Sequence, residues 1–254
     1  MTGDAQAGPA CPFGHGLPAS GNDYTGPVLP GDGATDYERY MRVGELLALQ
    51  KDPKEMAHPD EMMFTTIHQS FELWLKLVQF ELERVKQCID TDDFHTAGRF
   101  LRRSRLIIRA NTEALRIFDT MVPQEFHEVR RQLGQGSGAE SPGFRRLLQQ
   151  APTVWPHVQS LIARNDTTLE RVYTEKGHRP DLFGLFEAMT DFDQEVSDWR
   201  AAHVNVVKRI IGRDVLSLKG YAVHQLEEDI KTNLWPQLWK VREAVTELEG
   251  TSPA

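Results

Sequence analysis

The sequence predicts an all-α protein, folded as a helical bundle, and three observations lead to that prediction. Apolar side chains recur at steps of three and four residues along several long segments, which is the period of an amphipathic helix. No segment alternates apolar and polar residues in the way typical of a strand, and no internal repeat of fixed period is found. Helices with one apolar face are stable when they pack against one another, so a bundle follows.

The chain is expected to divide into an arm and one domain. Residues 1–34 are dense in Gly and Pro and show almost no periodicity, so we expect a flexible N-terminal arm. Residues 35–254 are expected to form a single helical domain. Its first expected helix covers residues 35–50, where Tyr37 and Tyr40 lie close to helical spacing with the leucines that follow.

The clearest expected helix covers residues 61–89. It follows a segment broken by two prolines, which offers Asp60 as the N-cap. The apolar stripe of this helix consists of Phe64, Ile67, His68, Phe71, Trp74, Leu75, Val78, Leu82 and Val85.

Further helices are expected over the rest of the chain. Residues 92–120 repeat the helical pattern, and a short helix is expected after Pro123. The glycine-rich segment LGQGSGAESPGF follows no strand and lacks the Lys-Ser/Thr ending of a P-loop, so we expect it to connect two helices. Residues 144–172 and 181–212 are expected to form two helices, and a last helix is expected over residues 221–249.

Composition excludes several classes of protein. The 254 residues carry a net charge of −8, which argues against a general nucleic-acid binder because phosphates require a basic face. No apolar run is long enough to span a membrane, and the N-terminus lacks a charged region followed by an apolar one, so secretion is not expected. Two cysteines, Cys11 and Cys88, make no disulfide scaffold, so a cytoplasmic location is expected.

Two histidines, His68 and His203, lie on the apolar stripes of two different expected helices. A buried imidazole costs free energy unless its nitrogens find partners. Each ring is either a core histidine bonded to a neighbour or part of a cofactor site built from facing helices. The sequence has no HExxH, no CxxC and no CxxCH. Non-covalent haem, which needs one neutral imidazole and an apolar slot, remains one candidate among several.

Residues 58–85 (HPDEMMFTTIHQSFELWLKLVQFELERV) closely resemble the tryptophan 2,3-dioxygenase family, whose signature on this helix is H-x-D-E-M-x-F-x-x-x-H-Q-x-x-E-L-W-x-K. Three more blocks occur in the family's order. Residues 37–50 resemble its Y-x-x-Y-x-x-x-x-x-L-L-x-x-Q motif, and residues 123–144 resemble its carboxylate-binding segment. Residues 199–212 (WRAAHVNVVKRIIG) resemble its W-R-x-x-H haem-ligand helix.

The resemblance implies an all-α bundle that encloses a b-type haem. His203 would bind the haem iron, with Trp199 beside it in the cofactor site. His68 would lie on the opposite, distal side as a hydrogen-bond partner or base for the ring nitrogen of the substrate. Phe64 would pack against the substrate ring, and Arg130 would hold the substrate carboxylate through a bidentate pair.

Further substrate-binding residues follow from the same resemblance, together with departures from it. Tyr37 and Tyr40 would reach a pocket, usually that of a neighbouring subunit, with ordinary half-buried packing as the alternative. Phe126 stands where the family usually has a tyrosine, and Leu133 ends the same short helix. The sequence RDVLSLKG stands where the family has Gly-Thr-Gly-Gly, so Ser217 (or Lys219 beside it) is the candidate that replaces it. The glycine-rich loop is longer than the family's, and the stretch between the two histidines is shorter.

These departures lead us to expect a specialised oxygenase acting on L-tryptophan or a tryptophan derivative, with O2 or H2O2 as oxidant. Monooxygenation of the indole ring, of the 2-oxindole type, is favoured slightly over ring cleavage to N-formylkynurenine. A haem-dependent tyrosine hydroxylase and a non-catalytic haem sensor or carrier are the alternatives. The resemblance also implies a homodimer or homotetramer, while nucleic-acid and membrane partners are not expected.

Overall fold

The computed structural model describes residues 26–175, 177–213, 215, 230, 232–248 and 250. No strand occurs among these residues, and the all-α prediction is confirmed. No helix among them has both the length and the apolar composition that crossing a membrane requires. The chain divides into two compact units, residues 1–51 and 52–254.

The first unit contains two short helices in place of the single helix predicted over residues 35–50. They are α1 (Asp36–Met41) and α2 (Val43–Leu47), and neither has a buried residue. Arg42 separates them in the left-handed region, with φ at 52°. That conformation interrupts the helical hydrogen bonds, so the prediction of one continuous helix is wrong.

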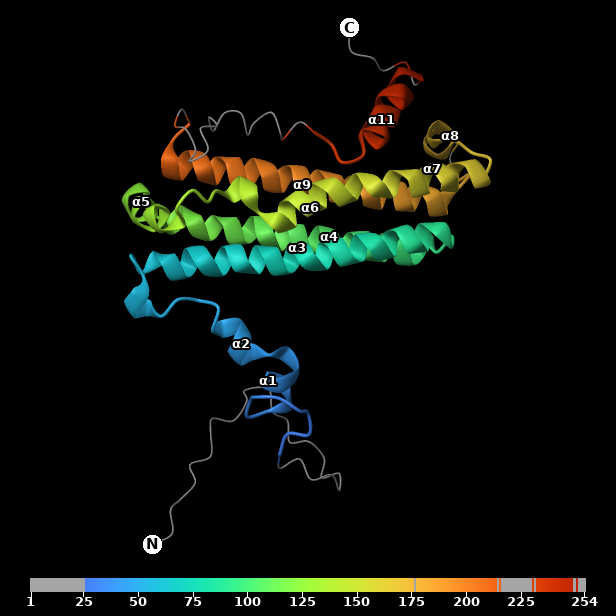
Figure 1. Ribbon diagram of the computed structural model, residues 1–254. Coiled ribbons are helices and arrows are strands. Elements are labelled where there is room, and N and C mark those ends of the chain that lie inside the picture. Colours follow the sequence, from blue (N-terminus) through green and yellow to red (C-terminus); the bar gives the residue numbers. More distant parts are fainter. Residues whose placement is uncertain are drawn as a thin grey trace, which may run out of the picture. The chain divides into compact units, whose positions relative to one another are not determined.

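The described part of the second unit consists of long and short helices, joined by loops and short 3-10 helices (Figure 1). Its α-helices are α3 (Asp60–Asp90), α4 (Phe94–Leu115), α5 (Pro123–Arg130), α6 (Pro142–Gln150), α7 (Trp155–Arg164), α8 (Leu169–Thr174), α9 (Pro180–Ile211) and α11 (Pro236–Leu248). Its 3-10 turns are η1 (Pro53–Glu55), η2 (Arg116–Thr120), η3 (Arg131–Leu133), η4 (Gly138–Glu140) and η5 (Ala151–Val154).

Three long helices, α3, α4 and α9, lie side by side along their lengths (Figure 1). α3 and α4 are antiparallel because only a short turn joins them. Arg105 of α4 pairs with Asp191 near the start of α9, and Asp119 after α4 accepts a bond from Arg209 near its end, so α4 and α9 run parallel. α6 and α7 pack along α3, and α11 packs against α8 and α9.

The predicted apolar stripes of α3 and α9 form much of the core. On α3, the buried members are Ile67, Phe71, Leu75, Val78, Leu82 and Val85. Phe64 and His68 are half-buried at the edge of that stripe. Trp74 is 44% exposed, so its prediction as part of the buried stripe is wrong.

The middle and the end of the chain differ from the prediction. Residues 144–172 form α6, η5, α7 and α8 rather than one helix. Pro152 and Pro156 each remove a backbone donor, and Asp166 at φ 47° turns the chain, so a continuous helix cannot form. Residues 232–235 are not helical and α11 begins at Pro236, so the prediction of one helix over residues 221–249 is wrong; Tyr221 lies outside the described residues.

Two local predictions concern the ends of helices. Pro59 is the N-cap of α3 and Asp60 is its first residue, so the predicted cap is displaced by one position. Nδ1 of His58 accepts the backbone N–H of Asp60, and the carboxylate of Glu61 accepts the backbone N–H of Ala57 just before the helix. The glycine-rich segment connects η3 to α6, and its prediction as a connection between helices is confirmed.

Candidate functional site

His203 lies on α9 with its imidazole stacked on the indole of Trp199. The two ring centroids are 5.4 Å apart and the planes are 5° apart. Burial, with a smaller contribution from the nearby His68, lowers the pKa of His203 to about 4. The ring is therefore neutral at neutral pH, and it makes no hydrogen bond to any residue that the structure describes.

His68 lies on α3 and contributes a second neutral imidazole. Its Nδ1 is 2.7 Å from the carbonyl oxygen of Phe64. A carbonyl only accepts, so Nδ1 carries the proton and Nε2 of the neutral ring is left as an acceptor. Burial lowers the pKa of His68, although its hydrogen bond to Phe64 and the charge of Glu72 oppose that shift.

Aromatic contacts join the two histidines into one cluster. The indole of Trp199 meets the ring of Phe71 edge-on at 6.3 Å, and Phe71 lies 6.3 Å from His68. The imidazole of His68 is 4.2 Å from the ring of Phe64. The structure thus brings together predicted site residues from two helices, α3 and α9, around apolar rings.

Other rings complete this cluster. Phe126 of α5 lies 6.3 Å from Phe64 and so belongs to the predicted substrate side. Phe118 contacts both Phe64 and His68, and Phe144 lies 4.5 Å from Trp199. Sequence reasoning missed Phe118 and Phe144 as site residues. A helical period does not show which apolar side chains gather around a site.

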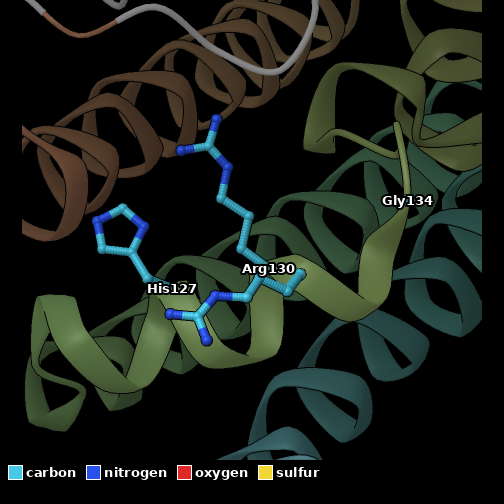
Figure 2. Close-up of a pocket in the computed structure, with 4 residues that line it drawn as sticks. His127, Arg130 and Gly134 are labelled. Atoms are coloured by element: carbon cyan, nitrogen blue, oxygen red, sulfur yellow. The ribbon is translucent and has the colours of Figure 1, made fainter.

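Arg130 lies at the end of α5, next to an open hollow of about 390 Å³. The hollow is lined by His127, Arg130, Arg131 and Gly134 (Figure 2). Arg130 is half-buried, and its guanidinium makes no hydrogen bond or ion pair with the described part of the chain. Arg130 lies one turn beyond Phe126 on the same helix. Its guanidinium, unpaired within the described chain, is therefore available to bind an anionic group of a ligand.

The remaining predicted substrate residues are exposed or lie outside the described residues. Leu133 is 37% exposed at the end of η3. Tyr37 and Tyr40, in the first unit, are 69% and 78% exposed. Ser217 and Lys219 lie outside the described residues.

Comparison with known proteins gives one family match and several full-length relatives. The family described as tryptophan 2,3-dioxygenase matches residues 23–151, just over half of the chain. The match includes α3 and α5 and ends before α9.

The relatives extend the similarity over nearly the whole chain. A tryptophan 2,3-dioxygenase of Burkholderia lata is 28% identical, over 94% of this chain and 97% of its own length. That of Paraburkholderia phytofirmans is 27% identical, over 91% of this chain and 94% of its own length. Tryptophan 2,3-dioxygenase 1 of Ralstonia nicotianae is 26% identical, over 83% of this chain and 90% of its own length. With its paired histidines set among aromatic rings, this chain belongs to the tryptophan 2,3-dioxygenase family of oxidoreductases.

Proposed function

We propose that this protein is a haem-dependent oxygenase that cleaves the indole ring of L-tryptophan with O2 to give N-formylkynurenine. The observation that carries the proposal is the pair of neutral imidazoles, His68 and His203, on facing helices and joined by aromatic rings. Family membership and the names of the relatives support the reaction and the substrate. Our sequence-based preference for monooxygenation finds no support in them, and they favour ring cleavage instead.

The residues of the cluster fit a b-type haem. Binding iron requires a neutral imidazole nitrogen, and burial keeps His203 in that form. The indole Nε1 of Trp199 and the Oγ of Ser137 are buried without a hydrogen-bond partner in the described chain, as expected of groups beside a ligand site. His203 would hold the iron, and the rings of Phe71, Trp199 and Phe144 would supply apolar walls. The bound haem would supply the redox chemistry that activates dioxygen.

The protein's own contribution is to bind and orient the substrate. Nε2 of His68 would accept the indole N–H, because its Nδ1 proton is already committed to the Phe64 carbonyl. The rings of Phe64 and Phe126 would hold the indole by apolar contact. Arg130 would fix the carboxylate, so that the ring lies in one orientation at the reacting centre.

Product analysis tests the reaction. Haem-loaded protein is incubated with L-tryptophan and O2 after reduction, and separately, in the ferric state, with H2O2. Ring cleavage adds both oxygen atoms of O2 to one product, whereas the peroxide reaction adds one oxygen and releases the other as water. A product with a single added oxygen would overturn ring cleavage. Turnover of L-tyrosine alone would indicate a hydroxylase, and binding without turnover would indicate a sensor or carrier.

The Arg130→Leu variant tests the carboxylate contact. Losing a charge-assisted hydrogen bond costs roughly 1.5–3 kcal/mol, so KM for L-tryptophan should rise about 10-fold to 150-fold. Arg131→Leu, an exposed arginine of the same hollow, should change KM by no more than about twofold. With 3-methylindole, which has no carboxylate, Arg130→Leu and wild type should behave alike. Equal KM values for L-tryptophan in Arg130→Leu and wild type would remove Arg130 from the site.

We also propose a location and an oligomeric state for the active protein. The reaction takes place in the cytoplasm, and the active form is a homodimer or homotetramer in which Tyr37 and Tyr40 reach a pocket. The exposure of both tyrosines in the first unit supports a role in contacting another surface.

A further inference from the structure

Glu72 ties the glycine-rich loop to α3. One carboxylate oxygen of Glu72 accepts the hydroxyl of Ser141 at 2.5 Å, and the other accepts the backbone N–H of Gly143 at 2.8 Å. Ser141 is the N-cap of α6 and also accepts the backbone N–H of Phe144. The carboxylate therefore lies at the start of a helix, where its charge is stabilised. Both of its oxygens are used by this one loop.

The loop approaches α3 so closely at position 143 that a side chain there would displace the carboxylate of Glu72. A Cβ added to Gly143 would lie 2.5 Å from Oε2 of Glu72 and 3.0 Å from the Cβ of Leu75. The side chain of Gln79 donates to the carbonyl of Gly143 at 2.9 Å, one turn further along α3. Three hydrogen bonds and a steric fit thus fix the end of the loop where α6 begins.

The middle of the same loop lies against the candidate site. A Cβ on Gly138 would be 3.7 Å from Nε2 of His203, so the backbone there lies one atomic layer from that nitrogen. The neighbouring Ser137 has a buried hydroxyl with no hydrogen-bond partner in the described chain. The position of the loop therefore decides where this free hydroxyl is placed relative to a ligand.

We propose that Glu72 is a positioning residue that sets the place of the 137–143 loop at the ligand site. Glu72 lies one turn beyond His68 on α3, so one helix carries both a residue predicted to contact the substrate and the anchor of the loop. Only the predicted effect of Glu72 on KM for L-tryptophan depends on the proposed function. The anchoring itself is independent of any reaction.

Two variants disrupt the contact between Glu72 and the loop, one by changing Glu72 and the other by changing Gly143. Glu72→Ala removes the carboxylate, and Gly143→Ala pushes it away through the added Cβ. Glu72→Gln keeps an acceptor for Gly143 but loses the charge, so its effects should be intermediate. Glu83→Gln is the matched control, because Glu83 is a carboxylate of the same helix that also meets a side chain of α6, Gln150.

Hydrogen exchange and kinetics are measured on the haem-loaded full chain. In Glu72→Ala and Gly143→Ala, the amides of residues 137–141 and 143 should exchange at least about tenfold faster, as expected when charge-assisted hydrogen bonds are lost. KM for L-tryptophan should rise at least about fivefold, as expected when a ligand-facing loop is displaced. Glu83→Gln should change neither quantity.

Three other results would each contradict one part of the proposal. Unchanged exchange in Glu72→Ala would show that Glu72 does not hold the loop. Faster exchange with unchanged KM would reduce the contact to a structural one and overturn the positioning role. If wild-type protein turned over no tryptophan, the proposed function would fail, while the exchange data would still decide whether Glu72 holds the loop.

Discussion

His203→Ala is expected to abolish the haem spectrum of the protein. The variant removes the imidazole that burial keeps neutral and that makes no hydrogen bond within the described residues. Loss of a partner behind a metal ligand costs about 10-fold to 100-fold in affinity, so loss of the ligand itself should weaken haem binding at least about 100-fold. The measurement is titration with haem, followed at the Soret band. Added imidazole should restore the band, because the space left by the ring can hold it.

The variant His68→Ala, compared with His203→Ala, decides which of the two histidines binds the haem iron. Histidines that bind metals commonly donate their second nitrogen to a carbonyl, and His68 does so whereas His203 does not. Retention of the Soret band in His68→Ala, with loss in His203→Ala, would assign the iron to His203. The reverse result would exchange the two roles. His127→Ala, an exposed histidine of the hollow beside Arg130, should leave the spectrum unchanged.

The long helices were predictable because each has its own periodic stripe. Residues 61–89 and 181–212 match α3 and α9 within one or two residues, since burying one face fixes the period of the apolar positions. The predicted helices over residues 35–50 and 144–172 were wrong because local backbone conformation interrupts a helix there, and the period of apolar residues does not show this. Arg42 adopts a left-handed conformation that an arginine rarely takes, and residues 144–172 contain two prolines that a loose apolar pattern masks.

The candidate site was predictable only in part. His68 and His203 could be found because a polar ring on an apolar stripe needs an explanation. The role of Glu72 could not, because its partners Ser141 and Gly143 are 69 and 71 positions away in the chain. A helical period describes one segment at a time and carries no information about which segments meet. The same reason hid Phe144, which meets Trp199 only after folding.

The buried carboxylate of Asp193 on α9 binds three N–H groups of the C-terminal segment. It is 2% exposed and accepts the backbone N–H groups of Leu234 at 2.9 Å and Trp235 at 3.1 Å. It also accepts the indole N–H of Trp239 at 3.0 Å. Further along α9, Arg200 donates to the carbonyl of Thr232 at 2.6 Å. The segment is thus held along the same helix that carries His203.

Asp193→Ala is therefore expected to lower the free energy of unfolding by about 3–5 kcal/mol, because two buried donors and one half-buried donor lose their acceptor at once. Urea denaturation at neutral pH measures the change. Asp193→Asn keeps one acceptor oxygen and should cost about half as much. Asp191→Asn, an exposed carboxylate on the same helix paired with Arg105, should cost no more than about 1 kcal/mol. A loss in Asp193→Ala as small as that in Asp191→Asn would mean that the hydrogen bonds to Asp193 contribute little to the stability of the fold. A large loss, together with weaker haem binding in Asp193→Ala, would make this segment part of the frame that holds His203.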